Sequence, residues 1–563
     1  MGQIGWPSKT HWVVPSESGG ILLDPPLEEA ACLVVQNHER RVNGADVASH
    51  AGLGELTRSA RREIIEAAVA YTTGYRDLDF PRQLEQRPLI LSGHQPELFH
   101  PGVWLKNFVL AEIARRTGAV PINLVIDADT IKGTSLPILQ GTLANPQLGT
   151  ISLDDYQPLV PFEIREVQNP ECFLSFPQRV CEQLGPFVAK PFVLDLWKFV
   201  KQRFGEEKRL GYILAQSRHL LEKEWGLVTL EVPQSRVCRS RSHLLFVARL
   251  LTELPRFREV YNAALARYRR LHRVRSAAQP LPDLGSQGEW IEAPFWVWRR
   301  DKPRRKPLFV SAKEDRIVLS DRNGWEFPLD VAGSVGVEKA AECLADLASA
   351  GVFLRCRALM TTLWARLVLA DYFIHGIGGA KYDEVTDDII REFFGVEPPP
   401  YMVVSGTLWL VKGEHRSCVE DLRAVEAELR QVRFHPERLF TNGSVDAKLE
   451  ANLSHDELKV VEELIAAKHA WISKQQTREN ARERFLAIRQ INEAFQPFLA
   501  SIVGQLEERR RKLLQQIRRQ SIFRYREFPF CFFEESSLRE FLQQVTKLSR
   551  ADATGSGNSR NSA

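Results

Sequence analysis

The residues from Ser92 to Lys106 carry the side chains best suited to bind an anion, and they read SGHQPELFHPGVWLK. They follow a short apolar run that predicts a buried strand, and they open a helix predicted over residues 102–116. A helix N-terminus attracts phosphate, and His94, His100 and Lys106 would add donors and charge there. The alternative is a capping and packing turn in which the two histidines only satisfy hydrogen bonds, and both interpretations stay open.

Two carboxylates, Asp127 and Asp129, end the next predicted strand, which covers residues 122–126. With one residue between them they project to the same face if the chain stays extended, so both could line one cleft. There they could hold a substrate amine, orient a nucleophile as a base, or bind Mg²⁺. An Asx turn or a helix N-cap is the alternative use of the same two residues.

The segment Gly-Ile-Gly-Gly-Ala-Lys-Tyr is a third candidate, and it predicts a flexible loop. Its candidate ligand-binding residues are Gly376, Gly378, Gly379, Lys381 and Tyr382. Glycines let the backbone approach a ligand closely, and amides in such loops can cradle anions. Glycine-rich connections between helices are also common for geometric reasons alone.

The eight cysteines are scattered, and no CxxC pair occurs among them. The sequence therefore encodes neither a zinc ribbon nor a thioredoxin-type pair in the usual way, and we expect no metal site. Scattered cysteines are typical of buried small hydrophobes in a reducing compartment, which favours a cytoplasmic protein. Since the sequence contains no apolar run of about 18 residues, we expect no membrane span.

Composition excludes several classes of protein. The chain has 563 residues, and its 44% hydrophobic and 26% charged residues exclude a wholly disordered or collagen-like chain. Its 75 basic and 71 acidic residues leave a net charge of only +4, which does not indicate binding of nucleic acid or of an anionic membrane. The basic runs within 299–306 and 509–512 are therefore interpreted as a solvated turn and a solvated helix face.

The predicted elements place the candidate segments in an α/β fold. A strand over 89–91, the helix over 102–116 and the strand over 122–126 form a βαβ unit, the core of a parallel sheet. Short strands within 295–319 predict a small antiparallel sheet. From 415 to 520 the composition shifts to Glu, Arg, Gln, Leu and Ala, which predicts a long helical hairpin or coiled-coil arm.

These changes of pattern divide the chain into consecutive segments. We expect the core to be split by an insertion and followed by the arm. The predicted boundaries are an N-terminal lead-in with one helix (1–84), the first part of the core (85–235), an inserted helical and small β region (236–330), the second part of the core (331–414), the arm (415–520), a C-terminal docking segment (521–548) and a disordered tail (549–563).

Taken together, these segments resemble the bacillithiol-biosynthesis cysteine-adding enzymes, the BshC family. The resemblance begins at SGHQPELFHPGVWLKN and VPINLVIDADT, is clearest from RCRALMTTLWARLVLADYFIHGIGGAKYDEV to FFGVEPPP, and ends with the arm and RYREFPFCFF. It implies a Rossmann-like core of the nucleotidyltransferase type, related to the HIGH-type nucleotidyltransferases, with inserted connecting regions and a C-terminal α-helical coiled coil that mediates dimerisation. The implied activity joins cysteine to glucosaminyl-malate.

The resemblance also assigns roles to the candidate residues. The catalytic residues would be His94, His100, Asp127 and Asp129, of which the aspartates would bind the amine or act as base. Substrate would be held by Gln95, Gly102, Lys106, Gly376, Gly378, Gly379, Lys381 and Tyr382. The cofactor stays open, with ATP or ADP as candidates for this cleft.

This chain departs from the family pattern at the same positions. The family usually has paired glutamines in place of His94-Gln95, and Thr-Gly-Pro in place of the residues His-Pro-Gly that end at Gly102. It tends to carry a carboxylate-His-Asp cluster in place of the residues Asp-Ala-Asp that end at Asp129. The resemblance therefore supports the family's fold more strongly than it supports the family's substrate.

Three functions follow from these observations. The first is a ligase that joins an amino acid such as cysteine to an amino-sugar conjugate in low-molecular-weight thiol biosynthesis. The second is a HIGH-type nucleotidyltransferase acting on a carboxylate or sugar phosphate, for which the two histidines are the discriminating feature. The third is a non-enzymatic scaffold that dimerises through its coiled coil.

Overall fold

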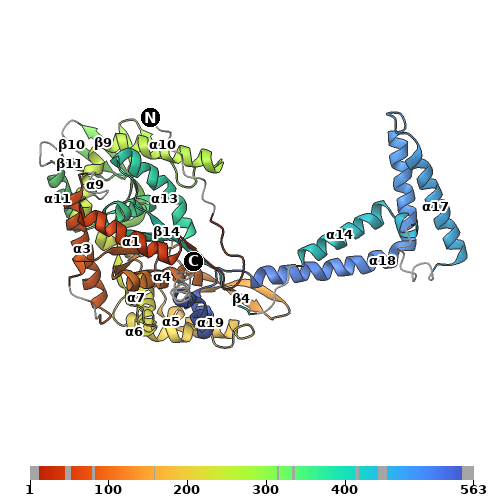
Figure 1. Cartoon of the computed structure of the whole chain (residues 1–563), viewed down its shortest axis with the longest axis horizontal. Helices are drawn as coiled ribbons and strands as arrows, with labels where there is room; N and C mark the ends of the chain where they lie inside the picture. Colours follow the sequence, from red (N-terminus) through yellow and green to blue (C-terminus); the bar gives the residue numbers. More distant parts are fainter. Residues whose placement is uncertain are drawn as a thin grey trace, which may run out of the picture. The chain divides into compact units, whose positions relative to one another are not determined.

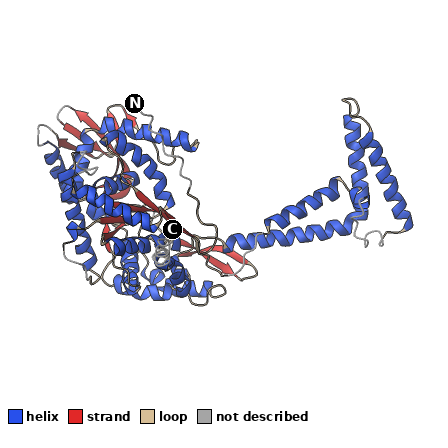
Figure 2. Cartoon of the chain, viewed as in Figure 1, coloured by secondary structure: helices blue, strands red, loops and turns tan. Residues whose placement is uncertain are grey.

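The structure is a computed structural model, and it describes residues 12–44, 52–78, 83–157, 159–313, 316–331, 336–412, 418–441 and 453–547. It is mixed α/β, 55% helical and 17% strand. The chain forms two compact units (Figures 1 and 2), of which the first comprises Met1–Gly141, Leu148–Leu410 and Arg526–Ala563 and the second Thr142–Gln147 and Val411–Tyr525. The tail predicted to be disordered, 549–563, lies outside the described residues.

A six-stranded sheet organises the first unit. Its strands lie in the order β1 (Ile21–Asp24), β14 (Tyr401–Gly406), β13 (Tyr372–His375), β2 (Leu89–His94), β3 (Val120–Val125) and β6 (Leu230–Pro233). All neighbours pair in parallel except β1, which is antiparallel to β14. Numbered along the chain from β2, the parallel strands lie in the spatial order 3-2-1-4-5, so the order reverses between β2 and β13.

Helix α4 (Pro101–Thr117) crosses one face of this sheet and contacts β2, β3, β13 and β14. It has a proline at its first position, and it ends at Gly118, which adopts a left-handed φ of 67°. The opposite face is apolar, because Leu89 and Leu91 join a core cluster with Ile64 of helix α3 (Gly54–Thr73). The parallel pairing of β2 and β3 around α4 confirms the predicted βαβ unit.

A second sheet is antiparallel, as predicted for residues 295–319. Its order is β11 (Glu326–Asp330), β10 (Arg316–Ser320), β9 (Lys302–Lys313), β8 (Trp290–Arg299) and β12 (Val352–Cys356), with β7 (Ser286–Gln287) beside β8. Strand β12 follows in the chain only after helix α11 (Gly336–Ser349). The sheet therefore reaches beyond the segment in which it was predicted.

The remaining elements of the first unit are mostly helices around these sheets. They are α1 (Leu27–Val42), α5 (Pro170–Leu184), α6 (Val193–Phe204), α7 (Leu210–Glu224), α8 (Gln234–Val237), α9 (Arg241–Thr252), α10 (Leu254–His272), α12 (Ala358–Trp364), α13 (Ile377–Ile389) and α19 (Glu535–Leu542). Strands β4 (Ser135–Gly141) and β5 (Pro146–Ser152) pair with each other. Short 3₁₀ or π turns cover Leu84–Gln86, Ala365–Leu369, Ile390–Phe394 and Phe530–Phe532.

The second unit is helical, as predicted for the arm. Its helices are α14 (Val419–Phe434), α15 (Arg438–Thr441), α17 (His455–Ser473) and α18 (Ala481–Phe523). Helices α14 and α17 both pack on α18, around a small core of Val432, Val461, Phe495 and Leu499. Pairing with a second copy stays a prediction.

Two predictions about local structure were wrong. The lead-in was predicted to hold one helix, but it also contains β1, which extends the sheet by pairing with β14, and α1, which follows β1. The predicted glycine-rich loop 376–382 is instead the beginning of α13, with Gly376 as its N-cap. Neither local sequence strongly favours the element that it forms. Contacts with residues distant in the chain stabilise both β1 and the start of α13.

Candidate functional site

The carboxyl ends of β2 and β13 meet at the point where the strand order reverses. Ser92 pairs with Ile374, so Gly93 and His94 of β2 come level with His375 and Gly376. In open α/β sheets, ligands bind outside the carboxyl ends of the strands at such a point. A ligand is therefore expected to bind at this position, which we call the switch edge.

Lys106 brings a positive charge to the switch edge. Its side chain projects from α4, and its ammonium donates a 2.7 Å hydrogen bond to Gly93 O. The residue is only 6% exposed, and among the described residues it forms no ion pair with a carboxylate. Burial, with repulsion from Arg218 second, lowers the pKa of Lys106 from 10.5 to about 8. Near neutral pH the site therefore holds a buried and mostly charged ammonium that has no counter-ion in the part of the chain that the structure describes.

Helix α13 presents its N-terminus at the same edge. Its N-cap, Gly376, has an extended backbone and supplies no side chain to cap the first amides. A Cβ atom placed on Gly378 would meet nothing within 4 Å, whereas one on Gly379 would lie 2.8 Å from His375 Nδ1. The first turn is thus open at Gly378 and closely packed at Gly379. Its unpaired amides can bind an anion.

The histidine that precedes this helix holds it in place. His375 Nε2 contacts the Asp383 carboxylate, and Arg366 lies 3.3 Å from Asp383 and 2.7 Å from Asp387. Burial raises the pKa of Asp387 to about 6. The cluster joins β13 to the interior side of α13. Lys381 is exposed and Tyr382 half-buried on the same helix, and both lie outside this cluster.

The two candidate histidines are engaged with protein groups. His94 places Nδ1 3.1 Å from Gln95 O and Nε2 3.2 Å from Asn107 Oδ1. His100 is the N-cap of α4, where Nδ1 accepts a hydrogen bond from the Gly102 amide at 3.1 Å. Burial lowers the pKa of His94 well below its usual value and that of His100 to about 3. Both rings are neutral at pH 7, and their geometry is that of the capping and packing interpretation.

Gly102 serves the packing of α4. A Cβ atom at this position would lie 2.1 Å from Gly406 O, at the end of β14. Only glycine allows the helix to approach the strand this closely, and no contact of Gly102 with a ligand follows from its position.

The two aspartates diverge instead of lining one cleft together. The chain turns after β3, so Asp127 is fully buried and accepts hydrogen bonds from Tyr212 Oη at 2.7 Å and Ser235 N at 2.8 Å. Asp129 lies nearer the surface, where Gln95 Nε2 donates to it at 3.1 Å and Arg305 at 2.8 Å. The premise of an extended chain is wrong here. Asp127 anchors α8, and Asp129 lies beside the switch edge, where it is paired with Arg305.

Glu97 joins Asp129 at the surface. Its pKa is raised because its carboxyl is desolvated and faces Asp129, with Lys132 acting in the opposite direction. A carboxylate with a raised pKa is a better proton acceptor near neutral pH. Glu97 was not among the predicted site residues, and Arg305 was assigned to a solvated turn. Its place two residues after Gln95, in the same turn, was the only signal for Glu97.

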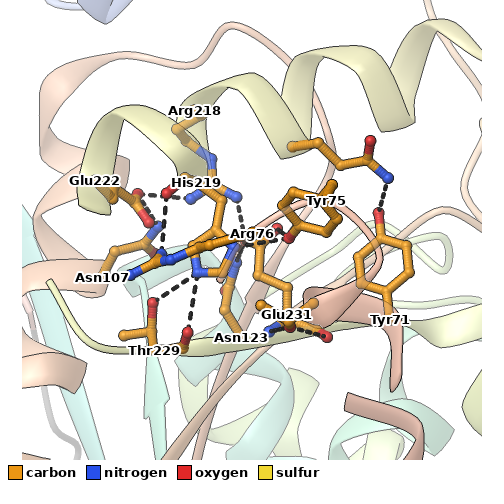
Figure 3. Close-up of polar contacts among 12 residues, drawn as sticks. Tyr71, Tyr75, Arg76, Asn107, Asn123, Arg218, His219, Glu222, Thr229 and Glu231 are labelled. Atoms are coloured by element: carbon orange, nitrogen blue, oxygen red, sulfur yellow. Dashed lines mark hydrogen bonds and ion pairs between the residues drawn. The ribbon is translucent and has the colours of Figure 1, made fainter. Parts of the chain in front are cut away.

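Beneath the switch edge lies a buried polar network (Figure 3). Arg218 of α7 donates to Glu222 at 2.6 Å and also to Glu231 of β6. Glu222 accepts a further 2.7 Å hydrogen bond from Asn107, the residue that contacts His94. Burial raises the pKa of Glu231 despite the opposing effect of Arg218. The network therefore connects His94 to the interior through one arginine shared by two carboxylates.

The rest of the network ties α3 and the segment after it to β6. Tyr75 Oη donates to His219 Nδ1 at 2.7 Å, and His219 Nε2 donates to Thr229 O at 3.1 Å (Figure 3). Asn123 of β3 donates to Glu231 at 2.8 Å. No motif marks these residues in the sequence, because their partners come from separate elements.

A cavity of about 720 Å³ lies at the opposite end of the strands from the switch edge, where β3 and β6 begin. Its lining includes Arg115, Trp225, Arg539 and Lys547. None of the predicted site residues lines it.

None of the described helices combines the length and apolar character needed to cross a membrane. A scan against models of protein families found no match to the chain. A search of curated proteins likewise found no similar sequence.

We expect Arg218→Met to lower the free energy of unfolding by about 3–5 kcal/mol, because it leaves two buried carboxylates without their shared cation. Urea denaturation followed by circular dichroism measures this change. The double variant Arg218→Met/Glu231→Gln should recover part of the loss, since it also removes one of those charges. A single-variant loss below about 1 kcal/mol would show that the network does not stabilise this face of the sheet.

Proposed function

We propose that the protein is an enzyme that binds a phosphate-bearing substrate, such as ATP, at the switch edge. The observation that carries this proposal is the buried ammonium of Lys106, which has no carboxylate partner among the described residues. It is bonded to Gly93, which the strand register places level with His375, the residue just before the N-cap of α13. A bound anion would supply the missing negative charge and accept hydrogen bonds from the helix amides.

The sheet supports the same proposal. The spatial order 3-2-1-4-5 is the order of the first five strands in dinucleotide-binding Rossmann folds, where the ligand crosses the position of reversal. We infer a Rossmann-like core of the nucleotidyltransferase type, with the second sheet and neighbouring helices as inserted connecting regions. ATP or ADP is the ligand that fits this site by charge and position.

We propose that the reaction is the ligation of an amino acid to an amino-sugar conjugate such as glucosaminyl-malate. The resemblance to BshC enzymes points to cysteine as the amino acid. The proposal rests on this resemblance and on the carboxylates of Asp129 and Glu97 beside the switch edge. The amino-acid carboxylate would attack ATP to give an acyl phosphate, with release of ADP, or an acyl adenylate, with release of pyrophosphate. The amine would then attack the carbonyl carbon, forming the C–N bond as phosphate or AMP leaves, and the proton lost by the amine would pass to a carboxylate.

The nucleotidyltransferase alternative of the HIGH type receives less support from the site. That reaction was expected to use His94 and His100 to stabilise charge on phosphate oxygens. Both imidazoles are neutral and engaged with protein groups. Lys106 and the amides of α13 take over that role in our proposal.

Dimerisation through the second unit remains part of the proposal. Phe434 and Phe485 expose 53% and 64% of their surface, and Val460 and Leu486 are also exposed. Apolar side chains on long helices are typical of surfaces that pair with another helix. The proposal places the enzyme in the cytoplasm, where ATP and reduced cysteine are available.

The central variant is Lys106→Met, which removes the charge and keeps much of the side-chain volume. We expect its affinity for ATP, measured by isothermal titration calorimetry, to fall about tenfold or more, because a charge-assisted hydrogen bond contributes about 1.5–3 kcal/mol. Its melting temperature should not fall sharply, since a buried charge is removed together with one hydrogen bond. Lys198→Met, which changes an exposed lysine of α6, should bind ATP as the wild type does. Equal affinities of wild type and Lys106→Met would refute the role of Lys106.

Affinity for ADP should fall as the pH rises, because Lys106 loses its proton. The lysine is charged below its pKa of about 8 and neutral above it, so affinity should decline from about pH 8 upward by up to tenfold per pH unit. The ADP phosphates are already ionised in this range, because their last pKa lies near 6. Fluorescence titration at a series of pH values measures the decline. Lys106→Met should show a flat profile over the same range, and a wild-type profile equally flat would contradict the assignment.

The ligase reaction has its own test. Incubation of the full chain with ATP, cysteine and glucosaminyl-malate should give the amide-linked adduct by mass spectrometry, with ADP or AMP in equal amount. Asp129→Asn should slow product formation by about 100-fold, the usual contribution of a general base. Asp195→Asn, which changes a half-buried carboxylate in the first turn of α6, is the control. A wild-type chain that binds ATP but forms no adduct would refute this reaction and leave the nucleotide site standing.

A further inference from the structure

Three side chains that commonly bind metals converge in the interior of the first unit. They are Cys238, which follows α8, His243 in the first turn of α9, and Cys356 at the end of β12. Their ligand atoms all lie within 4.8 Å of one another, and His243 Nε2 lies 3.2 Å from Cys356 Sγ. All three residues are buried. The structure thus assembles two thiols and an imidazole from three separate elements.

This arrangement matches the coordination chemistry of zinc. Zinc takes sulfur ligands at about 2.3 Å and nitrogen ligands at about 2.0–2.1 Å in a tetrahedron, so its ligand atoms lie roughly 3.5–3.8 Å apart. The three atoms of this cluster would need only small side-chain shifts to reach those separations. Thiolate and imidazole together favour zinc over magnesium or calcium, which bind oxygen. We propose that Cys238, His243 and Cys356 bind a zinc ion.

Zinc binds cysteine as the thiolate and histidine as the neutral imidazole. A zinc ion at Cys238, His243 and Cys356 would therefore displace the thiol protons and release them as it binds.

The surroundings balance the charge of such a site. Zinc with two thiolates and a neutral imidazole has no net charge, which suits a buried position. The nearby Arg355 is already paired with Glu163 through hydrogen bonds of 2.9 and 2.8 Å. Trp364 packs edge-on against His243 at 5.3 Å, and its indole Nε1 has no hydrogen-bond partner among the described residues. Three protein ligands leave a fourth position, which a water molecule fills.

The metal would link two parts of the fold. Cys238 and His243 lie just beyond β6 of the parallel sheet, and Cys356 ends β12 of the antiparallel sheet. Zinc at this point would cross-link the two sheets of the first unit. It would therefore stabilise the region of the fold that holds Asp127 and α8, without contacting the switch edge.

Elemental analysis of the full-length protein, expressed in zinc-supplemented medium and purified without chelator, tests this site. We expect about one zinc ion per chain. Cobalt substituted for zinc should show thiolate-to-cobalt charge-transfer absorption, which only cysteine ligands produce. Cys356→Ser should abolish the cobalt band and lower the zinc content at least severalfold, whereas Cys531→Ala, which alters a buried cysteine elsewhere, should change neither.

The wild-type measurements decide the matter even if Cys356→Ser fails to fold. A metal-free wild-type protein whose Cys238 and Cys356 are free thiols by alkylation and mass spectrometry would overturn the proposal, as would one in which they form a disulfide. Zinc that is present but retained in full by Cys356→Ser would overturn it as well.

Discussion

The first unit depends on one buried cation, Arg218, which lies between two buried carboxylates, Glu222 and Glu231. None of these charges could stay in the interior alone, because desolvating an unpaired ion costs several kcal/mol. The arginine therefore requires α7 and β6 to keep a single relative position. Asn107 extends the constraint to α4 by donating to Glu222. The sheet and the helix that crosses it are fixed together by this network.

The same constraint sets the properties of the switch edge. Burial, with repulsion from Arg218 second, lowers the pKa of both His94 and Lys106, and the histidine is neutral. A neutral His94 can be held between Gln95 and Asn107 as a packing element, while Lys106 keeps the charge that faces Gly93. Positive charge at this edge therefore comes from the lysine and from the amides of α13. An anionic ligand is the natural complement of that arrangement.

Much of the sheet could be predicted from the sequence, because apolar runs such as 89–91 and 122–126 make buried strands around an amphipathic helix. The predictions failed where long-range contacts decide the structure. Residues 21–24 become a strand only through pairing with β14, and the glycines after His375 become helical because β13 and Asp383 fix the start of α13. In the site, Lys106 and Gln95 lie where the spacing placed them. Arg305, which reaches Asp129 from a distant strand, and the cluster of Cys238, His243 and Cys356 have no local signal.

A crystal structure of the full chain with ADP tests the central claim most directly, because it shows where the phosphates bind. Our account predicts that the diphosphate lies between the Lys106 ammonium and the first turn of α13, with hydrogen bonds to the amides near Gly378. A diphosphate bound elsewhere, for example in the 720 Å³ cavity beside Arg115 and Arg539, with Lys106 still bonded only to Gly93, would contradict the account.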